Sequence, residues 1–327
     1  MPSRRRIVIA LGSALAAPRA AFAQQPAKLR RIGYLGSADE RTYAEPLERL
    51  RSGLRKLGYV EGKTIAFEYR FAEGKLERLP GLAGELVERK VDIILAHGTP
   101  DIRAAKQATS SIPIVMLSAG DPLGSGLVAS LARPGGNVTG LANLDVGLAA
   151  KRFELLKEVL PKLSRIAVVR NPANPVSELQ YRDTQAAARS FGIGVLLFDV
   201  RTLGELETAF QGMHKAGANA FTVMSDQSFL GWRERIAQLA IANRLPSIFA
   251  RSENVEAGGL MSYGASLVGL YGQSVGFIDK LLKGATPGEL PIEQPAKFEL
   301  FINLKTAAAL GIVISKSVLF RADRLIE

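Results

Sequence analysis

Six short loops carry most of the side chains that could bind a small polar molecule. Each loop follows an apolar run that predicts a buried β-strand. In open sheets of parallel strands, ligands bind beyond the carboxyl ends of the strands, which is where loops of this kind lie. The candidate ligand-binding residues in or shortly after these loops are Ser37, Tyr43, Gly98, Thr99, Ser118, Asp121, Asn171, Asn174, Ser225, Asp226 and Arg251.

The chemistry of these loops suits a small ligand with both a negative and a positive group. Backbone N–H groups at the starts of helices can receive a carboxylate or a phosphate, and Arg251 could add a charge-assisted pair of hydrogen bonds. Asp121 or Asp226 could receive an ammonium group. An amino acid would fit this inventory, although a sugar or a nucleoside would fit it too.

Several of the same residues also suit a purely structural role. Ser37, Thr99 and Asp121 each come close before a predicted helix, where such side chains cap the first turn, and capping is the commoner role. Tyr43 and Phe229 could stack on a ring of the ligand, but large aromatic residues more often lie in a core. The sequence therefore predicts a polar site without deciding which loop residues contact the ligand.

Motifs for catalysis are missing from the sequence. It contains no dinucleotide-binding glycine loop, no Gly-Lys-Ser/Thr phosphate loop and no G-x-S-x-G nucleophile turn. It has no cysteine, and its two histidines, His97 and His214, follow no metal-binding pattern. His97 ends a predicted strand, where a hydrogen bond to nearby backbone is expected, and His214 is expected at the surface. We predict no catalytic residue, no cofactor and no metal site.

The candidate loops are positioned by an alternation of strands and helices along the chain. Short apolar runs alternate with segments of helical periodicity, which is typical of parallel sheets covered by helices. Strands are predicted at 31–35, 65–69, 91–96, 112–117, 165–169, 194–198, 220–224, 246–249, 259–263 and 298–303. A short helix is predicted to start at Pro100. The other helices are predicted near 47–57, 79–88, 149–159, 179–190, 203–215, 232–243, 268–282 and 305–310. Two successive sets of this kind predict an α/β fold with two doubly wound, flavodoxin- or Rossmann-like lobes joined by a hinge.

The first 23 residues differ from everything that follows. Three arginines at 4–6 precede an apolar stretch at 7–17, and Ala21-Phe22-Ala23 supplies small residues around one peptide bond. This pattern predicts a secretory signal peptide at 1–23, cleaved near Ala23, and export to the periplasm by either the general or the twin-arginine route. Because cysteine is absent, we expect no lipid anchor in the membrane.

The charge of the remaining chain gives no sign of a nucleic-acid partner. Removal of residues 1–23 takes away four arginines and no acid, which leaves 38 basic and 31 acidic residues. No later segment concentrates lysine and arginine among aromatic residues, as a nucleic-acid groove would. We therefore expect a small-molecule ligand and no nucleic acid.

Several long stretches resemble a known family. They are GLRKLGYVEGKTIAFEYRFAEG from Gly53, LVASLARPGGNVTGL from Leu127, KRFELLKEVLP from Lys151, GGLMSYG from Gly258 and LPIEQPAKFELFINLKTAAALGI from Leu290. The chain resembles the ABC-transporter substrate-binding family that includes tryptophan-binding TrpX-like proteins. The resemblance implies a type I periplasmic-binding fold, a ligand held between two lobes and an ABC importer permease as partner. It also implies ligand contacts by the loops at Thr99, Asp121 and Asn171.

The lobes are expected to share the chain unevenly. The first lobe is predicted at 29–142 plus 252–290 and the second at 143–251 plus 291–327, with hinges near 141–145, 250–254 and 289–295. RPGGNVTGL at 133–141 is interpreted as the loop that approaches the first crossing. A periplasmic ligand-sensing module and a hydrolytic enzyme on the same fold are the alternative functions, but no pair of nucleophile and base supports an enzyme.

Overall fold

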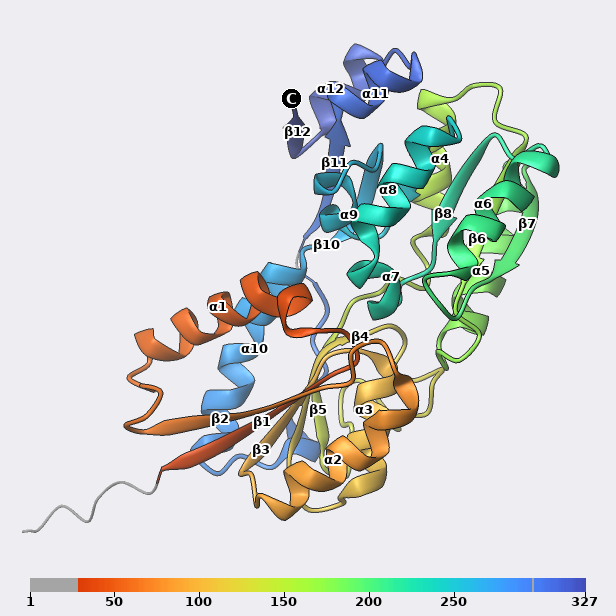
Figure 1. Ribbon diagram of the computed structural model, residues 1–327. Helices are drawn as coiled ribbons and strands as arrows, with labels where there is room; N and C mark the ends of the chain where they lie inside the picture. Colours follow the sequence, from red (N-terminus) through yellow and green to blue (C-terminus); the bar gives the residue numbers. More distant parts are fainter. Residues whose placement is uncertain (1–28, 296) are drawn as a thin grey trace, which may run out of the picture.

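Two lobes of α/β structure make up the protein in a computed structural model, which describes residues 29–295 and 297–327. Figure 1 shows strands β1–β5 with α1–α3 and α10 in one lobe, and strands β6–β12 with the remaining helices in the other. The predicted α/β class is therefore confirmed. The signal peptide predicted at 1–23 lies outside the described residues.

The first lobe contains a five-stranded parallel sheet in the order β2-β1-β3-β4-β5. Its strands are β1 (Arg30–Gly36), β2 (Ile65–Phe71), β3 (Ile93–Ala96), β4 (Ile114–Ala119) and β5 (Val138–Ala142). Its helical segments are α1 (Glu40–Lys56), η1 (Leu76–Arg78), α2 (Leu79–Glu88), α3 (Thr99–Ala108), α10 (Leu267–Leu282) and η2 (Pro287–Glu289). Side chains alternate along each strand: Ile93 and Leu95 pack with α1 and α10, whereas Ile94 packs with α2 and α3. Both faces of the sheet are buried, which is why β3 and β4 are continuous apolar runs.

Strand β5 is not expected from sequence, because it overlaps segment 133–141, which is rich in glycine and proline. Gly140 has φ +123°, a conformation that residues with side chains rarely adopt, and a Cβ at this position would collide with the backbone of Met116 on β4. The glycine therefore lets β5 lie against β4 at the edge of the sheet. The segment interpreted from sequence as a loop is partly a strand.

The second lobe is built on two strand groups that meet at one point. One has the order β7-β6-β8 and the other β12-β11-β10-β9, and a single bridge pairs Phe221 of β8 with Ser247 before β9. The strands are β6 (Arg165–Arg170), β7 (Gly194–Asp199), β8 (Ala220–Val223), β9 (Ile248–Phe249), β10 (Met261–Ala265), β11 (Phe298–Asn303) and β12 (Arg324–Ile326). The helices are α4 (Ala149–Val159), α5 (Ser177–Ser190), α6 (Glu205–Lys215), α7 (Gln227–Gly231), α8 (Arg233–Ala242), α9 (Ser252–Glu256), α11 (Leu304–Leu310) and α12 (Lys316–Arg321).

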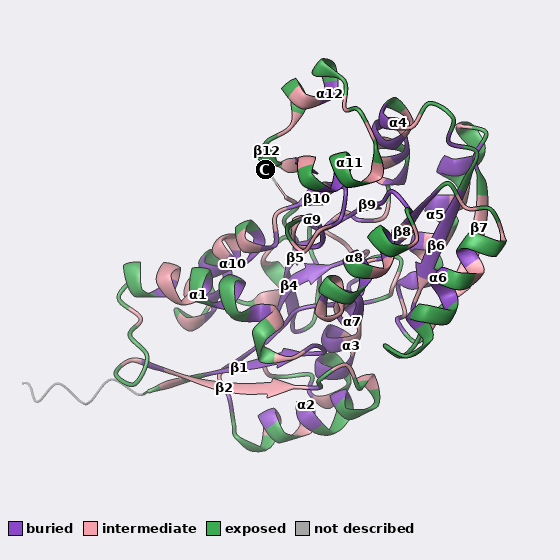
Figure 2. Ribbon diagram, turned by 45° about the horizontal axis from the view of Figure 1, so that its top comes forward, coloured by how far each residue is buried: buried purple, intermediate pink, exposed green. Residues whose placement is uncertain are grey.

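Helices cover the second lobe on both faces. One core contains apolar residues of α4 and α5, and a second contains those of α6 and α8. Figure 2 shows buried residues along strands such as β4 and β6, and exposed residues on the outer sides of helices such as α1 and α6. Within the part of the chain that the structure describes, no helix is long and apolar enough to span a bilayer.

Segment 252–265 packs differently from the sequence prediction, which placed it in the first lobe. Strand β10 pairs with β9 on one side and with β11 on the other, and α9 contacts β10 and β11. Strand pairing is a long-range property that the local pattern of 259–263 does not contain. We therefore propose that the second crossing between the lobes lies near Ser266, between β10 and α10, and not at 250–254.

Candidate functional site

The loops at the carboxyl ends of the strands in both lobes meet around one cavity. The first lobe contributes loops after β1, β3 and β4, and the second contributes loops after β6, β8 and β9. The residues that line this interlobe cavity are Ser37, Gly98, Thr99, Pro100, Ser118, Gly120, Asn143, Asn174, Val176, Gln180, Ser225, Asp226, Gln227 and Arg251. Eight of the eleven candidates from sequence lie in this set. Parallel strands explain this gathering, because their carboxyl ends all reach the same edge of a sheet.

Three predicted site residues lie outside the lining of this cavity. Tyr43 is fully buried in the first-lobe core, where its hydroxyl accepts a hydrogen bond from the backbone N–H of Ala38 at 3.1 Å. Asp121 accepts a hydrogen bond from the backbone N–H of Gly124 at 2.8 Å and so holds the turn after β4. Asn171 lies behind the cavity and donates to Asp226 at 3.2 Å. Asn171 therefore supports Asp226, a residue of the lining, from behind.

Asp226 is a buried carboxylate whose neighbours are neutral donors. Its Oδ2 accepts hydrogen bonds from the side-chain amides of Asn171 at 3.2 Å and Asn174 at 2.9 Å, and its Oδ1 accepts one from the backbone N–H of Ser228 at 2.8 Å. Burial raises the pKa of Asp226, and these donors oppose the rise. A carboxylate offers about four acceptor positions, so one remains for a ligand.

Arg251 connects the two lobes through a group that we call the crossing cluster, namely Ser118, Asp145, Arg152 and Arg251. The Nη2 of Arg251 donates to Ser118 Oγ in the first lobe at 3.0 Å and to Asp145 Oδ2 at 3.2 Å. Arg152 of α4 donates to the other oxygen of Asp145, also at 3.2 Å. Asp145 lies in the first crossing, so the chain between the lobes is held by two guanidinium groups.

Comparison with known proteins identifies the family. A family model described as ABC transporter substrate binding protein matches residues 43–326. The chain belongs to this family. A tyrosine-binding protein of Clostridioides difficile is 28% identical over 270 residues, which are 81% of this chain and 77% of that protein.

Solved structures agree with this family assignment. A conserved domain protein of Vibrio cholerae has a TM-score of 0.86 and 28% identity, and it covers 91% of this substrate-binding protein and 100% of its own chain. A Streptococcus pneumoniae protein in complex with L-Trp has a TM-score of 0.85 and 26% identity, with the same coverage of both chains. The predicted type I fold with two lobes and the predicted solute-binding role are thus confirmed.

Beneath the first-lobe side of the site, the binding protein buries a chain of hydrogen-bonded aromatic groups. Nδ1 of His97 lies 2.7 Å from the hydroxyl of Tyr271, which lies 2.7 Å from that of Tyr34. Burial, followed by the charge of Arg251, lowers the pKa of His97 well below its usual range. His97 is therefore a neutral structural residue whose partner is a tyrosine hydroxyl and not the backbone predicted from sequence.

Asp101 lies fully buried beside this group, at the start of α3. Its Oδ2 accepts hydrogen bonds from the backbone N–H groups of Gly98 at 3.2 Å and Ser37 at 3.3 Å, and both of those residues line the interlobe cavity. Burial raises the pKa of Asp101 to about 7 although these donors oppose the rise. The carboxyl therefore holds two site loops together while it titrates near neutral pH.

Replacing Asp101 by asparagine should change how stability depends on pH. The folded protein holds the Asp101 proton up to about pH 7, whereas the unfolded chain releases it near pH 4. The contribution of Asp101 to the free energy of unfolding is therefore complete below about pH 4. It falls as the pH rises to 7, and the whole decrease is about 4 kcal/mol. Urea denaturation from pH 4 to 8 should show that wild type loses more stability than Asp101→Asn over this range. Parallel curves would contradict the assignment, because the effect of His97 is common to both proteins and cancels.

Four polar residues of the site lie outside the loops predicted from sequence, namely Asn143, Asp145, Arg152 and Gln180. Asn143 and Asp145 come after an unpredicted strand, and the other two lie inside predicted amphipathic helices where charged and amide side chains normally face water. No local signal distinguishes them from surface residues. Tertiary packing turns them inward.

Proposed function

We propose that this binding protein captures an amino acid, or a similar small polar or aromatic solute, for an ABC importer. The solute would enter between open lobes and be enclosed when they close, and the permease would recognise the closed form. The observation that carries this proposal is the interlobe cavity, whose polar lining comes from both lobes. A ligand that contacts both lobes favours the closed form by its differential affinity for it.

The crossing cluster supports a closing motion around the same cavity. Arg251 comes from the second lobe, yet it donates to Ser118 of the first lobe and to Asp145 of the crossing. Opening the lobes would separate Arg251 from Ser118, and closing would restore this contact. The predicted crossing at 289–295 fits a further connection between the lobes, because Glu293 is hydrogen-bonded to β5 and β11 follows later in the chain.

We propose that the protein works in the periplasm after removal of residues 1–23. The basic start, the apolar stretch and the small residues before Gln24 support export. The relatives support a role in binding and none in catalysis, since they are substrate-binding proteins. Expression of the full chain with its amino terminus intact, followed by osmotic release and mass measurement, should yield a chain that begins at Gln24.

A thermal-shift screen tests the proposed function. Mature protein is heated with L-amino acids, sugars, nucleosides and small carboxylates, and a solute that binds the native form raises the melting temperature by mass action. We expect a shift with an amino acid or a close analogue, followed by a calorimetric titration with one site per chain. Failure of every class to shift the melting temperature would contradict capture of a free solute.

A further inference from the structure

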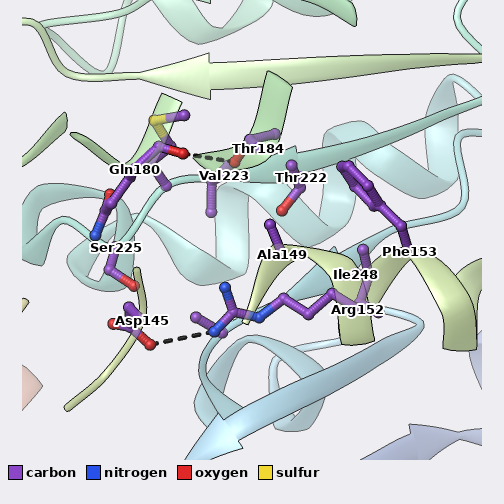
Figure 3. A pocket seen from close by; sticks show the side chains of 12 residues that line it. Asp145, Ala149, Arg152, Phe153, Gln180, Thr184, Thr222, Val223, Ser225 and Ile248 are labelled. Atoms are coloured by element: carbon purple, nitrogen blue, oxygen red, sulfur yellow. Dashed lines mark hydrogen bonds and ion pairs between the residues drawn. The ribbon is translucent and has the colours of Figure 1, made fainter. Parts of the chain in front are cut away.

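A second pocket lies next to the interlobe cavity and is lined mainly by the second lobe. We call it the inner recess, and its lining is Asp145, Ala149, Arg152, Phe153, Gln180, Thr184, Thr222, Val223, Met224, Ser225, Ile248 and Ala250. Gln180 and Ser225 line both spaces, so the recess adjoins the cavity. Because β8 and the chain before β9 are joined by a single bridge at Phe221 and Ser247, the strands can separate beyond that bridge and leave this space. Figure 3 shows the recess, with Arg152 and Asp145 on one side and Gln180 near Ser225.

Polar atoms without partners lie around the inner recess. Gln180 is only 6% exposed, yet neither its side-chain oxygen nor its side-chain nitrogen has a hydrogen-bond partner among the described residues. The buried hydroxyl of Ser225 also has none. Arg152 uses Nε for the carbonyl of Tyr263 and Nη2 for Asp145. Its Nη1 makes no hydrogen bond to any described residue, and Figure 3 shows one terminal nitrogen of Arg152 turned away from Asp145. The unmet side-chain groups of Gln180 and Ser225 are costly to bury unless a ligand or water meets them.

The charges of the crossing cluster do not balance. Two guanidinium groups, Arg152 and Arg251, share the single carboxylate of Asp145, which leaves one positive charge. Burial, opposed by Asp145, lowers the pKa of Arg152, and Arg251 adds to this lowering. Asp183 also acts on Arg152, less than Asp145 does, while its carboxylate caps the backbone N–H groups of Gly147 and Ala149. An excess positive charge beside apolar walls is unfavourable without an anion.

We propose that the inner recess binds a carboxylate group of the solute, which makes the solute a carboxylic acid such as an amino acid. The carboxylate accepts hydrogen bonds from Nη1 of Arg152 and from the side-chain amide of Gln180, and its charge balances the crossing cluster. One excess positive charge matches a carboxylate, which carries one negative charge, better than a phosphate, which carries up to two. This inference rests on the proposed function, because it names the chemical class of the captured solute.

Binding of matched acids and amides tests the inference. The probes are the twenty L-amino acids and their α-amides, with sugars and nucleosides in the same calorimetric and thermal-shift series. We expect an acid to bind and its amide to bind about 10- to 100-fold more weakly, which is the effect of one charge-assisted contact. Equal binding of acid and amide, or binding of sugars or nucleosides alone, would overturn the inference and leave solute capture intact. If no solute binds, the proposed function itself fails and the inference fails with it.

Two variants locate the carboxylate. Arg152→Gln should reduce the difference between acid and amide to less than about threefold, whereas Arg182→Gln, a change at an exposed position on α5, should leave it unchanged. Because Arg152→Gln also loosens the crossing cluster, Ala149→Leu provides a second variant that keeps every charge and fills the recess with a larger side chain. Weakened acid binding in both variants, with melting temperatures near that of wild type, supports the recess as the site. If Arg152→Gln still prefers the acid to its amide as strongly as wild type does, the carboxylate binds elsewhere. The same conclusion follows if Ala149→Leu binds the acid with unchanged affinity.

Discussion

Replacing Asp226 by asparagine should weaken the binding of an amino-acid solute by about 30-fold or more, which corresponds to at least 2 kcal/mol. Asp226 lines the interlobe cavity, and its partners are neutral amides, so its charge is available to an ammonium group. The variant should also lose its preference for an amino acid over the same acid without its amino group. Calorimetric titration of both ligands into both proteins gives the four affinities required.

Asp121→Asn is the matched control for this experiment. The sequence suits Asp121 and Asp226 equally as receivers of an ammonium group, but Asp121 caps the backbone N–H of Gly124 and does not line the interlobe cavity. The control should bind the amino acid as wild type does. A larger loss of affinity in Asp121→Asn than in Asp226→Asn would reverse the assignment.

Replacing Asp145 by alanine should destabilise the protein by about 3–5 kcal/mol. Asp145 is 3% exposed and accepts one hydrogen bond from each of Arg152 and Arg251. Its removal leaves two buried guanidinium groups without a carboxylate, and the desolvation of those charges is no longer offset. Urea denaturation at pH 7 measures the change in the free energy of unfolding.

A surface ion pair provides the comparison for Asp145. Asp199 pairs with Arg170 at 2.8 Å, but its side chain is 39% exposed, so Asp199→Ala should cost less than about 1 kcal/mol. The loss of stability in Asp145→Asn should lie between those of Asp145→Ala and Asp199→Ala, because asparagine keeps an oxygen acceptor for one arginine but lacks the charge. Equal losses of stability in Asp145→Ala and Asp199→Ala would show that the crossing cluster stabilises the protein no more than a surface ion pair does.

The fold and most of the predicted loop residues around the cavity could be predicted from local patterns. Continuous apolar runs predicted buried parallel strands such as β3, and their polar ends predicted loops that the structure brings together, including Thr99 and Ser225. These predictions succeed because side-chain periodicity and strand burial depend on residues that are only a few positions apart in the sequence. Local pattern also identified the basic and apolar start of the chain, which lies outside the described residues.

Tertiary structure decided which of these residues belong together. Strand β5 depends on the unusual backbone of Gly140 against β4, and β10 joins the second lobe through pairing with β11, more than thirty residues later in the chain. Tyr43 turned into the core, whereas Arg152 and Gln180 turned toward the inner recess. Periodicity alone predicts which face of an element is apolar, but the partner of a polar side chain depends on contacts between distant segments. The sequence by itself therefore determined the kind of fold and the loops that surround the interlobe cavity, and only the packing of the two lobes determined where the charges lie.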